Sequence, residues 1–383
     1  MIISCATYKS EFDFTQNIVE EIANAKVNWK QLYVVKYPVG INSCVEAIES
    51  LLDIRLDEFC VVGIRGLPGV GKTIIPKAVC NIIANCFDGS SFLENVRENL
   101  GIDAGIIKLQ EQLLNDILGN GNWRVGSRFR GISLVNERLC RKKLFLILDD
   151  VDDSTPIENL LGKCNWFAPR SRVIITLRDR HVLTTLKANV CTTNKVKEFE
   201  VEQLNKHEAL QLFKEHAFPR NKPHDEDYSK LATKFIDFAN NLPLALEIMA
   251  RDLCGRAKDE WESALDMYNK IPHKDIQKIL QVSYDGLNDL EKNIFLDIAC
   301  FFKGWNKDYV VKILNACGLC PKYGIPRLVI KRLVTDDGFG RLSMHDLIQQ
   351  MGREVVRQDA PDILEKRLYC YEDSLEVLTR NKV

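Results

Sequence analysis

The feature that most constrains this chain is a glycine-rich motif, Gly-x4-Gly-Lys-Thr, which runs from Gly66 to Thr73. Glycines at this spacing let backbone N–H groups face inward and surround phosphate oxygens. Lys72 would add a point charge toward the β- and γ-phosphates, and Thr73 would offer a hydroxyl to Mg²⁺. An apolar run precedes the motif and helical spacing follows it, which is the strand–loop–helix context that such a motif requires. The sequence therefore predicts a site for a purine nucleoside diphosphate or triphosphate, with contacts from Gly66, Pro68, Gly69, Val70, Gly71, Lys72, Thr73 and Ile74.

The residues around this loop predict an α/β domain. Short apolar runs occupy 59–64, 91–93, 144–148 and 173–176, and helical spacing occupies 43–52, 74–83 and 106–118. The apolar runs are continuous, as expected for strands whose two faces are both covered. Strands that alternate with helices predict a doubly wound parallel sheet, the P-loop NTPase fold, up to about residue 195. Ser43 is the expected N-cap of the helix over 43–52.

The second half of the chain predicts mostly helices. Helical spacing covers 204–217, 228–238 and 244–253, with prolines between these segments. A further helix spans 290–302, and the turn at 337–340 precedes a short run at 341–344. Helices followed by a tight hairpin favour a winged-helix module within 276–350.

Two carboxylates and one arginine are candidates for chemistry next to the loop. Asp149 and Asp150 follow the apolar run 144–148, at the strand end where open α/β sheets bind ligands. Asp149 would hold Mg²⁺, directly or through water, and Asp150 would orient or deprotonate an attacking water. Arg178 follows the run 173–176 and would sense a γ-phosphate.

The charge balance and the apolar content exclude other classes. The 52 basic and 53 acidic residues give a net charge of −1, so no general attraction to nucleic acid or anionic membranes is expected. No apolar run approaches the ~18–20 residues of a membrane span, and the N-terminus lacks a signal peptide. We expect a nucleotide as partner, no membrane contact, and a cytoplasmic location with the nucleus as the alternative. The 13 cysteines show no metal-binding spacing beyond the single close pair Cys317 and Cys320.

The order of motifs resembles the NB-ARC domain of plant disease-resistance proteins. The subclass with an N-terminal TIR domain and C-terminal leucine-rich repeats fits best, because Asp152 stands where the coiled-coil subclass usually has tryptophan. Besides the phosphate loop, the matching segments are 92–98, 146–152, 171–179, the GLPL-like 241–246, 295–302 and the MHD motif at 344–347.

The resemblance implies a domain order. It comprises a linker with a remnant of the last TIR helix at 1–36, a nucleotide-binding domain at 37–195, a helical ARC1 domain at 196–273, a winged-helix ARC2 domain at 274–350 and a C-terminal helical linker at 351–383. On this interpretation the chain is a truncated product or excised module without TIR domain and repeats. No NADase activity is then expected.

The resemblance also implies a mechanism. ADP would hold a closed, inactive form, and exchange for ATP would release the winged helix and allow self-association through the nucleotide-binding module. His345 would touch the ADP phosphates and Pro243 would line the pocket. The segment Val39-Gly40-Ile41 would lie near the adenine. The implied enzyme is at most a slow ATPase.

Several residues depart from the family pattern. Ile74 stands at a usual threonine, Pro76 enters the helix after the loop, Arg170 and Asn241 replace usual glycines, and Leu177 replaces a usual threonine. A proline is tolerated in a first helical turn but costs about 3 kcal/mol in a helix interior. We therefore expect nucleotide binding to survive but to be weakened.

Two other functions fit parts of the sequence. An active AAA-like ATPase coupled to mechanical work would share the loop and the carboxylates, and steady-state turnover would distinguish it. A nucleic-acid-binding regulator would use the winged helix, yet the basic residues of 276–350 are few and dispersed.

Overall fold

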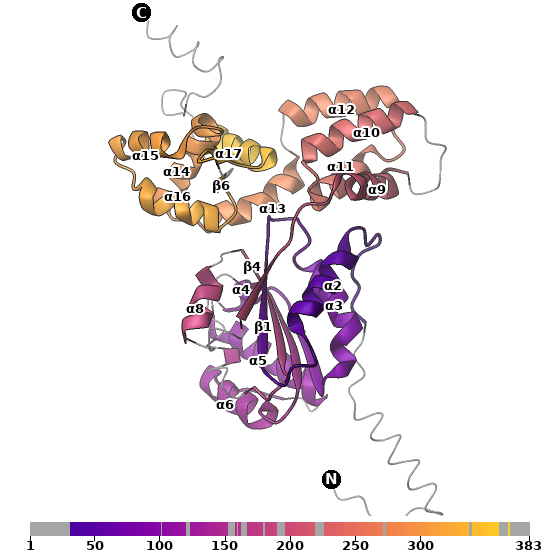
Figure 1. Ribbon diagram of the computed structural model, residues 1–383, viewed down its shortest axis with the longest axis vertical. Coiled ribbons are helices and arrows are strands. Elements are labelled where there is room, and N and C mark those ends of the chain that lie inside the picture. The colour runs from indigo at the N-terminus through magenta and orange to yellow at the C-terminus, as the bar shows by residue number, and fades with distance from the viewer. Residues whose placement is uncertain are drawn as a thin grey trace, which may run out of the picture.

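The computed structural model divides the chain into three groups of elements (Figure 1). A sheet with flanking helices forms the first group, and two helical groups lie side by side at one end of it. The described residues are 31–100, 102–119, 123–151, 158, 160–161, 167–178, 181–189, 196–218, 226–270, 273–336, 339–359 and 367. The predicted helical remnant within 1–30 and most of the predicted linker beyond 359 lie outside them.

The sheet is parallel and has five strands. These are β1 Cys60–Arg65, β2 Gly89–Leu93, β3 Leu144–Val151, β4 Arg172–Leu177 and β5 Val196–Glu200, in the order β2-β3-β4-β1-β5. The predicted doubly wound sheet is confirmed. The predicted end of this domain at residue 195 is too early, because β5 pairs with β1 in the same sheet.

Helices cover both faces of the sheet. One face carries α2 Ile41–Leu52, α3 Ile74–Ile83 and the short η2 Ala84–Cys86; the other carries α4 Val96–Leu100, α5 Asp103–Leu118, α6 Arg128–Leu139 and α8 His181–Asn189 (Figure 1). Along β3, Phe145 packs in the first core, whereas Leu144 and Leu146 pack in the second. Because successive side chains point to opposite faces, two covered faces require the continuous apolar runs seen in the sequence.

The start of α2 differs from the prediction. The helix begins at Ile41, and its N-cap is Gly40 in the left-handed conformation, with φ 71°. A Cβ at Gly40 would lie 2.5 Å from the Leu204 side chain. Ser43 is therefore inside the first turn and does not cap the helix, because a glycine is needed where the chain approaches Leu204 so closely.

A buried arginine joins α2 to the sheet. Arg172 of β4 is fully buried, and its guanidinium donates to backbone carbonyls at the end of α2 and in the loop that follows. The acceptors are the carbonyls of Leu52 at 2.5 Å, Asp53 at 2.5 Å, Leu56 at 2.9 Å, Glu58 at 2.5 Å and Ser171 at 3.1 Å. These bonds satisfy carbonyls that a helix end leaves without partners.

The first helical group contains α9 Lys206–Ala217, α10 Glu226–Ala239, α11 Pro243–Leu253 and α12 Lys258–Lys270. Its core is aromatic: Phe213, Phe235 and Trp261 are buried against one another, with ring centroids 5.8 to 6.0 Å apart. The predicted helices over 204–217, 228–238 and 244–253 are confirmed to within about two residues.

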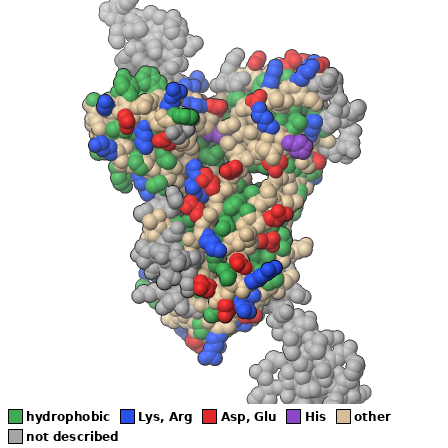
Figure 2. Space-filling model, in the orientation of Figure 1, with side chains coloured by type: hydrophobic (Ala, Val, Ile, Leu, Met, Phe, Trp, Pro, Cys, Tyr) green, Lys and Arg blue, Asp and Glu red, His purple; other side chains and the backbone are tan. Residues whose placement is uncertain are grey.

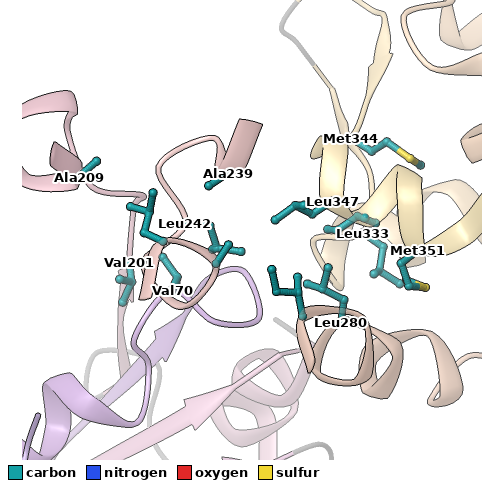
Figure 3. Close-up of a cluster of buried hydrophobic side chains, with 14 of the residues drawn as sticks. Val70, Val201, Ala209, Ala239, Leu242, Leu280, Leu333, Met344, Leu347 and Met351 are labelled. Carbon is teal, nitrogen blue, oxygen red and sulfur yellow. The ribbon is translucent and has the colours of Figure 1, made fainter. Parts of the chain in front are cut away.

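The second helical group contains the predicted winged helix. It contains α13 Lys274–Asp285, α14 Asp289–Asp297, the π-helical turn η5 Ile298–Phe302, α15 Lys307–Ala316, α16 Pro321–Ile330 and α17 Asp346–Asp359. The antiparallel pair β6 Thr335–Asp336 and β7 Leu342–Ser343 forms the expected hairpin. One hydrophobic cluster continues into the first helical group: Figure 3 shows Ala239 and Leu242 on one side of the junction and Leu280 and Leu347 on the other.

The two residues that replace usual glycines occupy left-handed positions. Arg170 has φ 67° and Asn241 has φ 57°. Asparagine tolerates this conformation better than most residues, whereas arginine does so at a cost of roughly 1 kcal/mol. Both departures therefore retain the turns that the usual glycines would make.

Candidate functional site

The glycine-rich loop forms a concave backbone between β1 and α3. Gly69 has φ 80° and Gly71 has φ 107°, conformations that favour glycine. A Cβ at Gly71 would meet no atom within 4 Å, so open space lies beside it. Within the described residues, no hydrogen bond engages the N–H groups of Gly69, Gly71, Lys72 or Thr73. The loop thus presents several free donors to one space, as an anion site requires.

Pro76 does not disturb the helix after the loop. It is the third residue of α3, and Ile74 and Ile75 both donate to the Gly71 carbonyl, at 3.0 and 3.1 Å. Since the first turn of a helix has no intrahelical acceptors for its N–H groups, the missing donor of Pro76 costs little.

Lys72 is held over the loop by backbone carbonyls. Its ammonium donates to the carbonyls of Gly66 at 2.9 Å and Leu67 at 2.8 Å. Burial lowers the pKa of Lys72 to about 7, with a smaller contribution from the charge of Arg178. A phosphate beside the loop would stabilise the charged form of this amine.

Asp149 lies at the end of β3 and is buried among hydroxyl groups. Thr73 donates to its two oxygens at 3.0 Å each, and Thr176 donates at 2.6 Å. Burial raises the pKa of Asp149, although these hydroxyls partly offset the shift. A carboxylate and a hydroxyl this close are the hard oxygen ligands that Mg²⁺ prefers, and a cation would relieve the buried charge. The residues present therefore fit Mg²⁺.

Asp150 is engaged by two arginines. Its carboxylate lies 2.9 Å from Nε of Arg178 and 3.2 Å from Nε of Arg97, and each guanidinium faces a different oxygen. The backbone of Asp150 is left-handed, with φ 59°, and its N–H donates to the Thr176 hydroxyl at 2.8 Å. In this conformation both oxygens of the candidate base are already paired with guanidinium groups.

A cavity of about 310 Å³ opens between the loop and the strand ends; we call it the phosphate cavity. Helix α13 of the winged-helix group reaches it through Ile279, and α11 reaches it through Pro243. Its lining residues are Pro68, Gly69, Gly71, Lys72, Thr73, Ile74, Asn95, Asp149, Asp150, Thr176, Arg178, Pro243, Leu244, Glu247 and Ile279.

A second cavity, of about 180 Å³, lies on the other side of the loop. We call it the apolar cavity after its aliphatic side chains, although charged side chains also line it. The predicted segment Val39-Gly40-Ile41 lines it, together with Val70. Tyr37 and His216 form an edge-to-face ring pair at its wall, with centroids 4.9 Å apart. Four residues line both cavities: Gly71, Ile74, Pro243 and Glu247.

Most predicted contacts lie on one of these cavities, but two do not. Gly66 accepts a hydrogen bond from Lys72 and is not part of either lining. His345 is buried between β7 and α17, where its Nδ1 accepts from the Leu347 N–H at 3.1 Å. Burial lowers the pKa of His345 to about 4, so the imidazole is neutral near pH 7.

Sequence reasoning missed several lining residues, among them Glu247 and Tyr37. Glu247 follows Pro243 by four residues, which places both on one face of α11. That spacing is a usable signal once Pro243 is suspected. Tyr37 gives no comparable signal, because its cavity wall forms only when α9 packs against the segment before α2.

The winged helix contacts the site directly. Arg178 donates to the Ser283 hydroxyl of α13 at 3.4 Å, while its Nε contacts Asp150. The loop itself is tied to the first helical group, because the Leu244 N–H donates to the Gly69 carbonyl at 3.2 Å. All three groups of elements therefore meet at the phosphate cavity.

Two other kinds of site are absent from the described residues. No group of three or more His, Cys, Asp or Glu side chains there is arranged to hold a metal ion. No helix in the described ranges combines the length and apolar content that a bilayer crossing requires. Figure 2 shows acidic and basic side chains interspersed on the visible face, without a large basic patch.

Comparison with known proteins agrees with this geometry. Residues 41–223 match the NB-ARC domain, and residues 288–360 match the winged-helix domain described as Roq1-like, of disease resistance proteins. The chain is 40% identical over 353 residues to the disease resistance protein RUN1 of Vitis rotundifolia, covering 91% of this chain and 26% of that protein. It is 34% identical over 380 residues to the TMV resistance protein N of Nicotiana glutinosa, covering 97% and 32%. The chain thus spans about a quarter to a third of the length of these curated relatives.

A solved structure has the same fold. The Walker-type ATPase paby2304 of Pyrococcus abyssi superposes with a TM-score of 0.59 at 12% sequence identity, covering 82% of this chain and 95% of that one. At this identity the likeness concerns the fold alone, a P-loop NTPase sheet followed by helical elements.

Proposed function

The chain belongs to the NB-ARC proteins of TIR-type plant disease resistance, and from this premise we propose that it is an ADP/ATP switch in plant immune signalling. In this proposal ADP maintains the closed arrangement of the three groups, and ATP favours a form in which the winged helix is released. The relatives are longer proteins, so the proposal concerns the nucleotide-dependent switch and leaves pathogen recognition aside.

The observation that carries the proposal is the pair of joined cavities. The phosphate cavity contains the free loop N–H groups, Lys72 and the Thr73–Asp149 pair. The apolar cavity offers aliphatic side chains and the Tyr37–His216 ring pair to a purine base, and it meets the phosphate cavity beside Gly71. A nucleotide has this order of parts: a flat aromatic base, a sugar and anionic phosphates. Mg²⁺, when bound to Thr73 and Asp149, would neutralise phosphate charge.

Communication with the winged helix would run through Arg178. This side chain lines the phosphate cavity and contacts both Asp150 and Ser283. A γ-phosphate would compete for the guanidinium, because a charge-assisted bond to phosphate is stronger than one to a neutral hydroxyl. The bond to α13 would then be lost. Nucleotide identity would thereby change the docking of the winged helix, as a switch requires.

The state of Asp150 supports retention of nucleotide over rapid turnover. A base that already contacts two guanidinium groups is poorly placed to accept a proton. This argues against the alternative of a mechanical ATPase and for at most slow hydrolysis.

His345 would contact the nucleotide only after a movement of the winged helix. It lies outside both cavity linings, and its buried Nε2 makes no hydrogen bond of normal geometry among the described residues. Burial lowers the pKa of this imidazole, and the nearby Ala239 carbonyl opposes that shift only weakly. A buried N–H donor without a good acceptor is costly. We propose that bound ADP draws the winged helix inward and that this nitrogen then donates to a phosphate. Self-association and a cytoplasmic location remain parts of the proposal that rest on the family alone.

Analysis of the resident nucleotide tests the switch. The protein is purified without denaturation, the nucleotide is released by acid, and its identity and amount are measured by chromatography. We expect ADP at close to one equivalent, and Lys72→Met, which removes the loop charge, should contain much less. A folded wild-type protein that carries no nucleotide and shows no binding of ADP by titration calorimetry would contradict the proposal.

A further inference from the structure

The junction between the two cavities contains one side chain with a clear hydrogen-bonding capacity. The four residues that line both cavities are Gly71, Ile74, Pro243 and Glu247. Glycine, isoleucine and proline have no polar side-chain atoms. Glu247 alone brings two carboxylate oxygens to this junction.

The covalent order of a nucleotide assigns an occupant to the junction. If the phosphates lie on the loop and the base lies in the apolar cavity, the ribose must lie between them. A ribose carries 2′ and 3′ hydroxyl groups, which are hydrogen-bond donors, and a carboxylate accepts from such donors strongly. Resting on the proposed function, we infer that Glu247 accepts a hydrogen bond from the ribose and makes the site selective for ribonucleotides over deoxyribonucleotides.

The surroundings of Glu247 prepare it for this role. Its Oε1 contacts the guanidinium of Arg251, one helical turn further along α11, and Arg251 lines the apolar cavity only. No hydrogen bond or ion pair in the described part of the chain engages Oε2. Arg251 thus compensates the negative charge from the side away from the phosphates, and one oxygen remains for the sugar.

Helix geometry fixes the position of the carboxylate. Pro243 is the first residue of α11, and Leu244 donates its N–H to the Gly69 carbonyl at 3.2 Å, so the start of the helix is attached to the loop. Glu247 lies one turn beyond Pro243 on the same face. Its side chain is 27% exposed, so the acceptor is partly shielded from competing water. Ile74, at a position where the family usually has a hydroxyl residue, leaves Glu247 without a rival polar side chain at the junction.

Titration calorimetry of the purified full chain with ADP, 2′-deoxy-ADP and 3′-deoxy-ADP tests the inference. Wild-type protein should bind ADP about tenfold to a hundredfold more tightly than at least one of the deoxynucleotides, which is the effect of one hydrogen bond to a charged group. Glu247→Leu should lower the affinity for ADP to that for the deoxynucleotide and leave the latter unchanged. Glu262→Leu, at an exposed glutamate of α12, serves as the matched control and should retain the full preference.

The outcomes separate this inference from the proposed function. Equal affinity of the wild type for all three nucleotides overturns the inference, although the switch proposal stands. An equal loss of affinity for all three nucleotides in Glu247→Leu also overturns it, because the residue then shapes the pocket without recognising the ribose hydroxyls. A folded wild type that binds none of them overturns the proposed function, and the inference falls with it. Circular dichroism of each variant establishes that it is folded.

Discussion

Arg178 lies 2.9 Å from Asp150 and within hydrogen-bond distance of Ser283, so one guanidinium joins the strand end of the sheet to the winged helix. Its neighbour Arg97 contacts the same carboxylate at 3.2 Å but does not line the phosphate cavity. The two arginines therefore share a partner and differ in their access to a phosphate. This difference makes them a matched pair for experiment.

We expect Arg178→Gln to weaken ATP binding about tenfold and to change ADP binding little. The reason is that in the proposed switch the γ-phosphate, and neither of the other two phosphates, reaches this guanidinium, and one charge-assisted bond contributes about 1.5–3 kcal/mol. Arg97→Gln should leave the ratio of the ATP and ADP affinities unchanged. Competition binding of both nucleotides to both variants checks this, and an equal loss in the two variants would exclude a sensing role for Arg178.

The lowered pKa of Lys72 predicts that ADP binding takes up a proton. At about pH 8 the free amine is mostly neutral, because its pKa is about 7, whereas the bound phosphate favours the charged form. Affinity should therefore fall as the pH rises above 7, by up to about tenfold per pH unit. Calorimetry at one pH in buffers of different ionisation enthalpy measures the protons taken up. Lys72→Arg stays charged and should show no uptake; a wild type without any buffer dependence contradicts the prediction.

Arg172 should be among the most important residues for stability. Its replacement by methionine removes the donor from the buried bond to the Leu52 carbonyl and from the partly buried bonds to the Asp53 and Glu58 carbonyls, and we expect a loss of at least about 3 kcal/mol. The exposed Arg170, which pairs with Asp57, is the control: Arg170→Met should cost less than about 1 kcal/mol. Denaturant unfolding of both variants gives the two free energies. Similar losses of unfolding free energy in the two variants would show that the hydrogen bonds of Arg172 stabilise the fold no more than the exposed ion pair of Arg170.

An ion-pair cluster holds the winged helix against the sheet domain. Glu200 at the end of β5 contacts Arg332, which follows α16, and also Arg65 of β1, the latter at 2.6 Å. We expect Glu200→Gln to raise the population of open molecules by roughly fivefold, because such partly exposed pairs contribute about 1 kcal/mol. X-ray scattering should then report a larger radius of gyration at low salt. Lys312→Gln, at an exposed site of α15, should give the wild-type curve. An unchanged radius for Glu200→Gln would show that other contacts hold the domains.

Sequence patterns predict those elements whose residue types reflect their burial. The central strands β1, β3 and β4 are buried on both faces, so their apolar runs are unmistakable. The edge strand β5, Val196-Lys197-Glu198-Phe199-Glu200, escapes prediction because three of its five residues are charged and only the first is buried. Residue type favours Ser43 as a cap, whereas the contact of Gly40 with Leu204 decides where α2 begins.

The candidate site is predictable where its chemistry lies within one segment. The loop from Gly66 to Thr73 carries its own geometry, and Asp149 follows from its place at a strand end. Glu247 and Ile279 reach the site only because helices from other groups pack onto the loop. Once Pro243 is suspected, its four-residue spacing points to Glu247, but nothing in the sequence of α13 distinguishes Ile279 from other residues on that helix, so tertiary structure is needed to find it.

The wall that Pro243 and Glu247 contribute to both cavities has a consequence for inheritance by recombination. The two cavity linings contain residues from both sides of the boundary near residue 200 between the sheet domain and the first helical group, so a crossover there between two related genes would combine two halves of one pocket. In such a hybrid the phosphate-binding loop would come from one gene and α11 from the other. The two would not have evolved to pack against each other. The segment from about residue 33 to residue 279, which contains both linings, should therefore be exchanged as a block, whatever the divergence of the sequences on either side.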